Sequence, residues 1–206
     1  MVTSVKKPSE QKLSDITSKE SMLTLILAVA KKAGVKMAIG GGLAVSAYGF
    51  RRETSDVDAF FHYTDQHKVL RALNQLANDY QLVEMHPSQW FALPPGAEPD
   101  ERIDLLFASS DPEESAIEMS KIRNCLGIST PVFPIDLLVI SKFLADREDP
   151  RDLLDILTLH RRGAFDVEEV MLRLRQMGLE EDAIRFRDQL NQLETMLSKR
   201  GRHAKT

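Results

Sequence analysis

The sequence predicts an α+β protein: a small mixed β-sheet core flanked by helices, followed by a C-terminal helical subdomain. Two observations predict this class. Up to about residue 133, short apolar runs typical of strands, such as "VKMAI" at 35–39 and "RIDLLFAS" at 102–109, alternate with helical segments. From Pro134 onward the apolar residues recur only at helical spacing. A chain of 206 residues can build one ample core with a small helical appendage.

The individual elements follow from periodicity and from end signals. A helix is expected from Ser18, whose side chain can cap it, to Gly34, which can end it. The proline-rich segment 90–101 predicts a loop. The other expected elements are strands at 35–39, 55–62, 81–85 and 102–109, one or two helical turns at 43–49, a helix at 65–80, a hairpin at 121–133, and helices at 134–146 and 149–163 with two more up to about residue 199.

We divide the chain into four parts on this basis. Residues 1–16 are polar and are expected to lack fixed structure. Residues 17–133 form the α/β core, and residues 134–198 form the helical subdomain. Residues 199–206 form a basic tail, which is either a local basic patch or a solvated terminus.

Charge and composition exclude several classes of protein. The formal net charge is −4, so the protein as a whole does not attract nucleic acid electrostatically, although a local tRNA site stays open. Cys125 is the one cysteine, which excludes an internal disulfide framework. No apolar run approaches the roughly 20 residues that span a bilayer, and the first residues have no signal-peptide pattern. We therefore expect a cytoplasmic protein without a membrane partner.

Two aspartates one residue apart, Asp56 and Asp58, begin an apolar strand. Aspartate is a poor strand former and is costly to bury without a partner. Because strand side chains alternate, both carboxylates project from one face while Val57 points the other way. Asp104, in another apolar run, can complete a two-metal site of the kind used in phosphoryl transfer. The structural alternative is that Asp56 caps a turn and Asp58 pairs with an arginine.

Gly41 and Gly42 lie upstream of these aspartates, between a strand and a helical segment. Backbone amides in such a turn can approach phosphate oxygens closely, because glycine has no Cβ and tolerates positive φ. A glycine run after a strand is also common for purely structural reasons. The glycines therefore favour a phosphate site only in combination with the aspartates.

Together these residues resemble the signature of the DNA polymerase beta nucleotidyltransferase superfamily: Gly41-Gly42, thirteen residues, then Asp56-Val57-Asp58. The segment "PIDLLVISKFLADREDPRDLLDIL" is similar to a helical segment of the AbiEii-like branch and of related uncharacterised nucleotidyltransferase-like domains. The positions that match the branch are Ala44, Gly49, Arg52 and Thr54 in the first segment, and Lys142, Arg151, Asp152 and Asp155 in the second. The resemblance covers about residues 35–160, and the last 45 residues match no family.

The resemblance implies a role for each matching residue. Gly41 and Gly42 would hold the triphosphate of an NTP, and Asp56 and Asp58 would bind Mg²⁺ or Mn²⁺. Asp104 would be the third carboxylate, as a metal ligand or as the base that activates the acceptor. The remaining implied site residues are Lys142, which would neutralise the triphosphate, and Arg52, Thr54 and Asp152 at the nucleotide. Structural alternatives stay open for three of them. Lys142 can be a snorkelling surface lysine, Asp152 can complement a helix dipole, and Arg52 can form a purely structural ion pair.

Two functions of different classes follow. The first is a metal-dependent nucleotidyltransferase that moves an NMP from an NTP to a hydroxyl of a tRNA 3′ end, a protein or a small molecule such as an aminoglycoside, with toxin-like relatives implied by the resemblance. The alternative is a non-catalytic nucleotide-binding or toxin–antitoxin interaction module on the same fold, with a cognate partner protein. Retention of all three carboxylates favours the enzyme, because function lies in the site and not in the fold.

Overall fold

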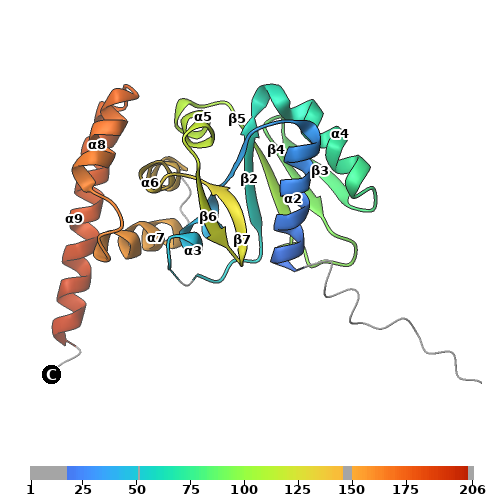
Figure 1. The fold of residues 1–206 in the computed structure, drawn as a ribbon. Helices are drawn as coiled ribbons and strands as arrows, with labels where there is room; N and C mark the ends of the chain where they lie inside the picture. The colour runs from blue at the N-terminus through green and yellow to red at the C-terminus, as the bar shows by residue number, and fades with distance from the viewer. Residues whose placement is uncertain (1–17, 51, 146–149, 204–206) are drawn as a thin grey trace, which may run out of the picture.

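The computed structural model describes residues 18–50, 52–145 and 150–203, with side chains up to residue 196 (Figure 1). The strands are β1 (Met37–Ile39), β2 (Val57–His62), β3 (Gln81–His86), β4 (Gln89–Leu93), β5 (Ile103–Ala108), β6 (Lys121–Cys125) and β7 (Ile128–Val132). The helices are α2 (Lys19–Ala33), α3 (Gly41–Ala47), the 3₁₀ turn η1 (Tyr63–Asp65), α4 (Gln66–Leu76), α5 (Asp111–Glu118), α6 (Ile135–Leu144), α7 (Pro150–Arg161), α8 (Val167–Gln176) and α9 (Glu180–His203).

The strands form one mixed sheet in the order β3-β4-β5-β2-β1-β7-β6. β2 pairs in parallel with β5 and antiparallel with β1, and β1 pairs in parallel with β7. The register places Asp58 opposite Asp104 on neighbouring parallel strands. This mixed sheet with flanking helices confirms the predicted fold class, and its central pair, β2 and β5, carries two of the predicted carboxylates.

Alternation along β2 and β5 separates the two faces of the sheet. One face is fully apolar and buried, with side chains at most 2% exposed: Val57, Ala59, Phe61, Ile103, Leu105 and Phe107. The prediction that Val57 and Ala59 point into the core is therefore confirmed. The opposite face carries Asp58 and Phe60 from β2 beside Asp104 and Leu106 from β5. On that face the polar residues come first along both strands and the apolar residues follow.

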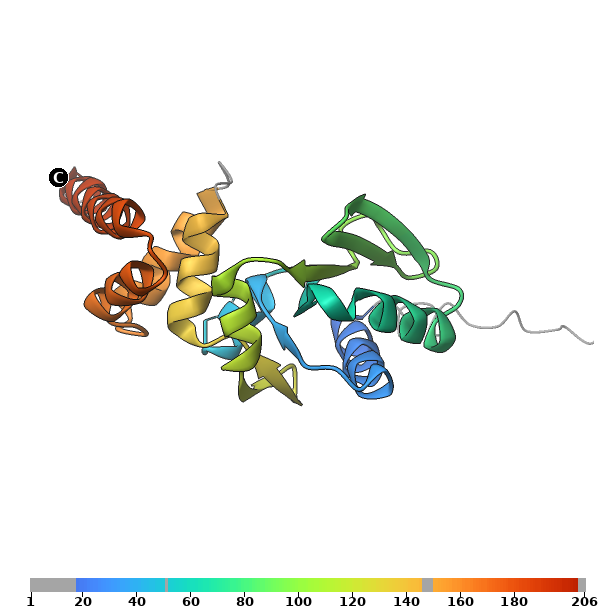
Figure 2. The ribbon, with the colours of Figure 1, turned by 90° about the horizontal axis from the view of Figure 1, so that it is seen from above.

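Two pairs of helices lie at opposite ends of the molecule (Figures 1 and 2). α2 and α4 pack side by side at one end, while α8 and α9 pack together at the other. α6 and α7 lie between the α8–α9 pair and the sheet in both views. Among the described residues, no helix combines the length and the apolar character that crossing a membrane requires.

The ends of several helices follow the sequence signals. The Ser18 side chain accepts a hydrogen bond from the Ser21 amide at the start of α2, and Gly34 ends the helix in the left-handed conformation. α7 begins at Pro150, as the sequence predicts. α3, however, begins at Gly41 and not after the glycines, so both glycines of the pair lie in its first turn.

The prediction of a loop at 90–101 is wrong in its first part. Residues Gln89–Leu93 form β4, which pairs antiparallel with both β3 and β5. The run "WFAL" has strand-forming aromatic residues, and pairing on both sides outweighs the loop signal of the prolines that follow. Helix α5 was not predicted; Pro112 in its first turn and three acidic residues there are favourable start signals.

The four-part division of the chain stays a prediction. Residues 1–16, expected to lack fixed structure, lie outside the described residues. The change to a wholly helical pattern after β7 is observed, since α6 to α9 follow it in order. Helix α9 extends into the predicted basic tail at 199–206, since its backbone continues to His203.

Cys125 at the end of β6 provides a test of the core. Its side chain is 1% exposed, and burial raises the pKa of its thiol, against smaller opposing effects of a hydrogen bond with Thr130 and of Arg123. We expect iodoacetamide at pH 8 to alkylate Cys125 at least about 100-fold more slowly in the native protein than in urea, because burial raises the pKa of the thiol and keeps the reagent out until the core opens. Equal rates in both conditions, followed by mass spectrometry, would contradict the buried position.

Candidate active site

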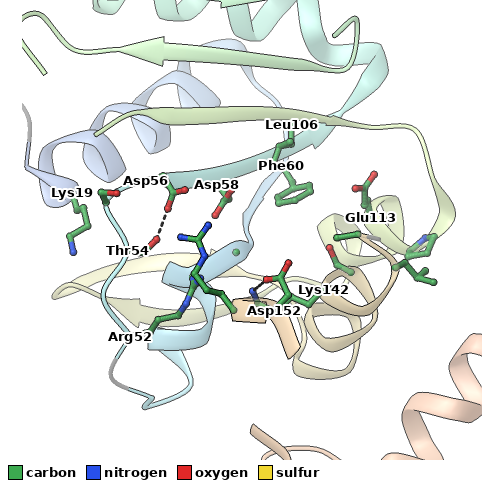
Figure 3. Close-up of a pocket in the computed structure, with 18 of the residues that line it drawn as sticks. Lys19, Arg52, Thr54, Asp56, Asp58, Phe60, Leu106, Glu113, Lys142 and Asp152 are labelled. Carbon is green, nitrogen blue, oxygen red and sulfur yellow. Dashed lines mark hydrogen bonds and ion pairs between the residues drawn. The ribbon is translucent and has the colours of Figure 1, made fainter. Parts of the chain in front are cut away.

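A cleft of about 1370 Å³ opens over the polar end of the β2–β5 face (Figure 3). Its lining comes from segments distant in sequence: the start of α2, the α3–β2 region, the start of α5, α6 with α7, and the turn between α8 and α9. Eight of the predicted site residues line it: Gly41, Gly42, Arg52, Thr54, Asp56, Asp58, Lys142 and Asp152. Asp104, the ninth, is 6% exposed and lies beside them in the sheet.

The three predicted carboxylates form one cluster. Asp56, Asp58 and Asp104 each offer an oxygen, and these oxygens all lie within 4.8 Å of one another. The cluster arises from two regular features: alternation puts Asp56 and Asp58 on one side, and parallel pairing of β2 with β5 brings Asp104 next to Asp58. Three carboxylates this close repel one another unless cations neutralise them. The donor set, all hard oxygens, suits Mg²⁺ or Mn²⁺.

Arg102 is a neighbour of the cluster that the sequence reading missed. Its Nε donates a hydrogen bond of 2.7 Å to Asp104 Oδ1, and its guanidinium lies 4.0 Å from the centre of the Phe91 ring. Partial burial lowers the pKa of Arg102, but the hydrogen bond and the charges of the three aspartates outweigh this effect and raise it. Arg102 therefore stays charged. Its position two residues before Asp104, on the same strand face, is the signal that could have identified it.

Gly41 and Gly42 leave space that other site residues use. A Cβ on Gly41, whose φ is +54°, would lie 1.6 Å from Asp58 Oδ2. A Cβ on Gly42 would lie 1.8 Å from Arg52 Nη1 and 2.9 Å from Thr54 Oγ1. The glycine pair is thus required sterically by the polar side chains packed against it, apart from any role with phosphate.

Arg52 and Thr54 connect the glycines to the carboxylates. The Thr54 hydroxyl donates a hydrogen bond to Asp56 Oδ1. Arg52 Nε lies 3.2 Å from Asp155 Oδ2 on α7. Figure 3 shows the guanidinium of Arg52 pointing into the cleft, toward the carboxylates of Asp56 and Asp58.

Lys142 lies in a buried network of ion pairs. Its Nζ is 2.6 Å from Asp152 Oδ1 and 2.8 Å from Asp155 Oδ2, and its side chain is only 6% exposed. Asp155 thus contacts both Lys142 and Arg52 through the same oxygen. Because two carboxylates already neutralise Lys142, its positive charge is offset within the protein. Asp155 matched the family pattern in the sequence, but its contact with Arg52 could not be read there.

The lining also includes residues that were not predicted from the sequence. Phe60 and Leu106 form an apolar floor that continues the sheet face past the carboxylates (Figure 3). Their spacing of two residues from Asp58 and Asp104 could have predicted them. The remaining contributions, from the first turns of α2 and α5 and from the α8–α9 turn, depend on packing alone.

Comparisons with solved structures relate this architecture to known proteins. The solution structure of the antibiotic-resistance factor ANT(2″)-Ia matches with a TM-score of 0.53 and 18% identity, over 91% of this chain and 99% of that one. The crystal structure of ANT(2″)-Ia with adenylyl-2″-tobramycin matches with 0.52 and 19%, over 86% and 98%. The lincosamide antibiotic adenylyltransferase LnuA, bound to lincomycin, matches with 0.50 and 19%, over 69% and 96%.

The chain has a nucleotidyltransferase fold. At the level of the fold, this agrees with the resemblance to the nucleotidyltransferase superfamily in the sequence. No family model and no curated protein matches the sequence. The AbiEii-like branch therefore stays a prediction from the sequence motifs.

Proposed function

We propose that this protein is a metal-dependent nucleotidyltransferase that moves an NMP from an NTP to a hydroxyl acceptor and releases pyrophosphate. The observation that carries the proposal is the cluster of Asp56, Asp58 and Asp104 at one end of a large cleft, on a nucleotidyltransferase fold. Enzymes of phosphoryl transfer act mainly by positioning and by charge neutralisation. A carboxylate cluster open to a cleft is suited to both.

In this proposal, Asp56 and Asp58 would hold Mg²⁺ or Mn²⁺, and the bound cation would supply neutralisation of the charge that develops on the triphosphate. Asp104 serves as the third ligand rather than as a general base, because Arg102 already binds one of its oxygens. Gly41 and Gly42 offer backbone amides to the triphosphate, and Arg52 and Thr54 border the same region. Lys142 and Asp152 line the cleft beyond them.

We further propose a small molecule as the acceptor. The described lining carries eight carboxylates and four basic side chains: Glu20, Glu53, Asp56, Asp58, Glu101, Asp111, Glu113 and Asp152 against Lys19, Arg52, Lys142 and Arg151. An acidic lining repels a polyanion such as a tRNA end and attracts a neutral or cationic compound. The solved structures of similar fold, ANT(2″)-Ia with adenylyl-2″-tobramycin and LnuA with lincomycin, support a small acceptor.

The experiment is a transfer assay with each of the four α-³²P-labelled NTPs and Mg²⁺, against a panel of hydroxylated amines, deacylated tRNA and protein acceptors. Label in a small molecule, together with pyrophosphate release that EDTA abolishes, is the expected result. Label in tRNA or protein would overturn the choice of acceptor but not the reaction. Binding of an NTP without transfer to any acceptor would favour the alternative, a non-catalytic nucleotide-binding or interaction module.

The finer assignment to the AbiEii-like branch, with a toxin role and a cognate partner protein, is supported by the sequence motifs alone. In the structure, Lys142 contacts both of the other matching residues, Asp152 and Asp155. Co-expression with the neighbouring open reading frame and a growth assay would test that role. Normal growth on expression of the active enzyme would contradict it.

Arg102→Gln provides a test of the metal site. Removing the positive charge that pairs with Asp104 Oδ1 makes the cluster more negative, so we expect the affinity for Mn²⁺ to rise about tenfold. Without metal, the variant lacks the ion pair between Arg102 and Asp104, so we expect it to melt at a lower temperature. Calorimetric titration of Mn²⁺ measures the first effect, and Arg71→Gln on the exposed side of α4 is the control. Weaker Mn²⁺ binding would mean that Arg102 orients Asp104 for the metal.

A further inference from the structure

Asp155 on α7 joins the cleft to the helical end of the molecule. It is 7% exposed, and its Oδ2 lies 3.2 Å from Arg52 Nε and 2.8 Å from Lys142 Nζ. A carboxylate so deeply buried is stable only when cations compensate its charge. Here the two cations come from different places: Lys142 from α6, and Arg52 from the connection between α3 and β2.

Arg52 is the partner of Asp155 that lies outside a helix. It lies on a connection without regular secondary structure, and its long side chain must be restrained to present the guanidinium in one orientation. Asp155 engages Nε, on the inner edge of the guanidinium. Nη1 then lies beside Gly42, where a Cβ on that glycine would be only 1.8 Å away. The restrained group is thus directed at the glycines and at Asp56 and Asp58 (Figure 3).

Lys142 is the more deeply buried of the two cations that contact Asp155. Its side chain is 6% exposed and its charge is shared between Asp152 and Asp155. It holds the Asp155 carboxylate in place, and Asp155 in turn holds Arg52. Arg52, whose side chain is 20% exposed, has the better access to a ligand in the cleft.

We propose that Asp155 is a positioning residue, which acts through Arg52 to orient the guanidinium toward the triphosphate of the nucleotide, and that Lys142 serves to anchor Asp155. This inference rests on the proposed function, because the proposed function is what makes a nucleotide triphosphate the ligand of Arg52. A planar guanidinium binds phosphate through two parallel N–H donors, and such bonds depend strongly on orientation. A carboxylate behind the guanidinium supplies that orientation without touching the ligand.

The test uses inorganic tripolyphosphate with Mg²⁺, which probes the phosphate site whatever base the protein prefers. Calorimetric titration compares wild type, Asp155→Asn, Arg52→Ala and the double variant. We expect Asp155→Asn to weaken binding about tenfold and the double variant to bind no more weakly than Arg52→Ala alone, since both act through one contact. Asp155→Glu, which keeps the charge, should recover part of the affinity.

A matched control separates positioning from general destabilisation. Glu194→Gln breaks a different ion pair of α7, the one between Glu194 and Arg161, which measures 2.9 Å and lies outside the cleft lining. It should leave tripolyphosphate affinity unchanged. AMP, which lacks the β- and γ-phosphates, should bind wild type and Asp155→Asn equally, whereas a structural defect would weaken both ligands. If Asp155→Asn does not fold, the same comparison is made in a Lys142→Met background. The double variant Lys142→Met/Asp155→Asn, which removes one charge of each sign, is then compared with Lys142→Met alone.

The outcomes are distinguishable. Equal tripolyphosphate affinity in wild type and Asp155→Asn, additive effects in the double variant, or no binding by the wild type each overturn the inference. Binding that depends on Asp155, in a protein that transfers no NMP to any acceptor, overturns the proposed function and leaves the inference standing. A transferase whose KM for the NTP rises in Asp155→Asn, with kcat changed less, supports both.

Discussion

Asp58→Asn is expected to lower the rate of NMP transfer about 10³-fold, equivalent to about 4 kcal/mol of lost transition-state stabilisation. Asp58 lies at the centre of the cluster, beside Asp104 in the sheet register and within 4.8 Å of both other carboxylate groups. An amide keeps the shape of the side chain but removes the charge that binds a hard cation. The measurement is single-turnover transfer at saturating Mg²⁺.

The stability of this variant should change in the opposite direction. Without metal, three carboxylates in the cluster repel one another, so removing one charge is expected to leave the melting temperature equal or higher. Added Mg²⁺ should then stabilise the wild type but not Asp58→Asn. The matched control is Asp79→Asn, which changes an exposed aspartate outside the cleft lining. Full activity in Asp58→Asn would contradict the assignment of the cluster as the catalytic metal site.

Gly41→Ala is expected to lower transfer by more than about 100-fold, through geometry and not through charge. The added Cβ would lie 1.6 Å from Asp58 Oδ2, so either the carboxylate or the backbone must move away. At a φ of +54° the alanine also strains the backbone, and we expect a loss of about 1–3 kcal/mol in the free energy of unfolding. Transfer rates and urea unfolding curves measure the two effects.

Gly163→Ala separates these two causes. Gly163 has a similar φ of +64°, but a Cβ there meets nothing within 4 Å and the residue does not line the cleft. Gly163→Ala should lose free energy of unfolding through the strained backbone but keep its transfer activity. If both alanine variants lost activity equally, the loss would come from backbone strain, and the close approach of Asp58 to Gly41 would not matter for catalysis.

The correct predictions from sequence share a local origin. The capped helix α2, the hairpin of β6 and β7, and the common face of Asp56 and Asp58 each follow from spacing within a few residues. The error at β4 has the opposite origin. Residues Gln89–Leu93 become a strand because β3 and β5 pair with them on both sides, and this pairing is not visible in the local pattern.

The sequence by itself therefore determined the two aspartates on one strand face, the glycine pair and the helical character of the C-terminal half, because alternation and helical period act over short distances. Only the tertiary structure decided that Asp104 lies opposite Asp58, since that depends on the register between two strands whose paired residues are 46 positions apart. It also decided that Asp155 contacts Arg52, which requires α7 to pack near a connection about 100 residues earlier. Long-range packing sets these contacts, and no short-range spacing encodes them.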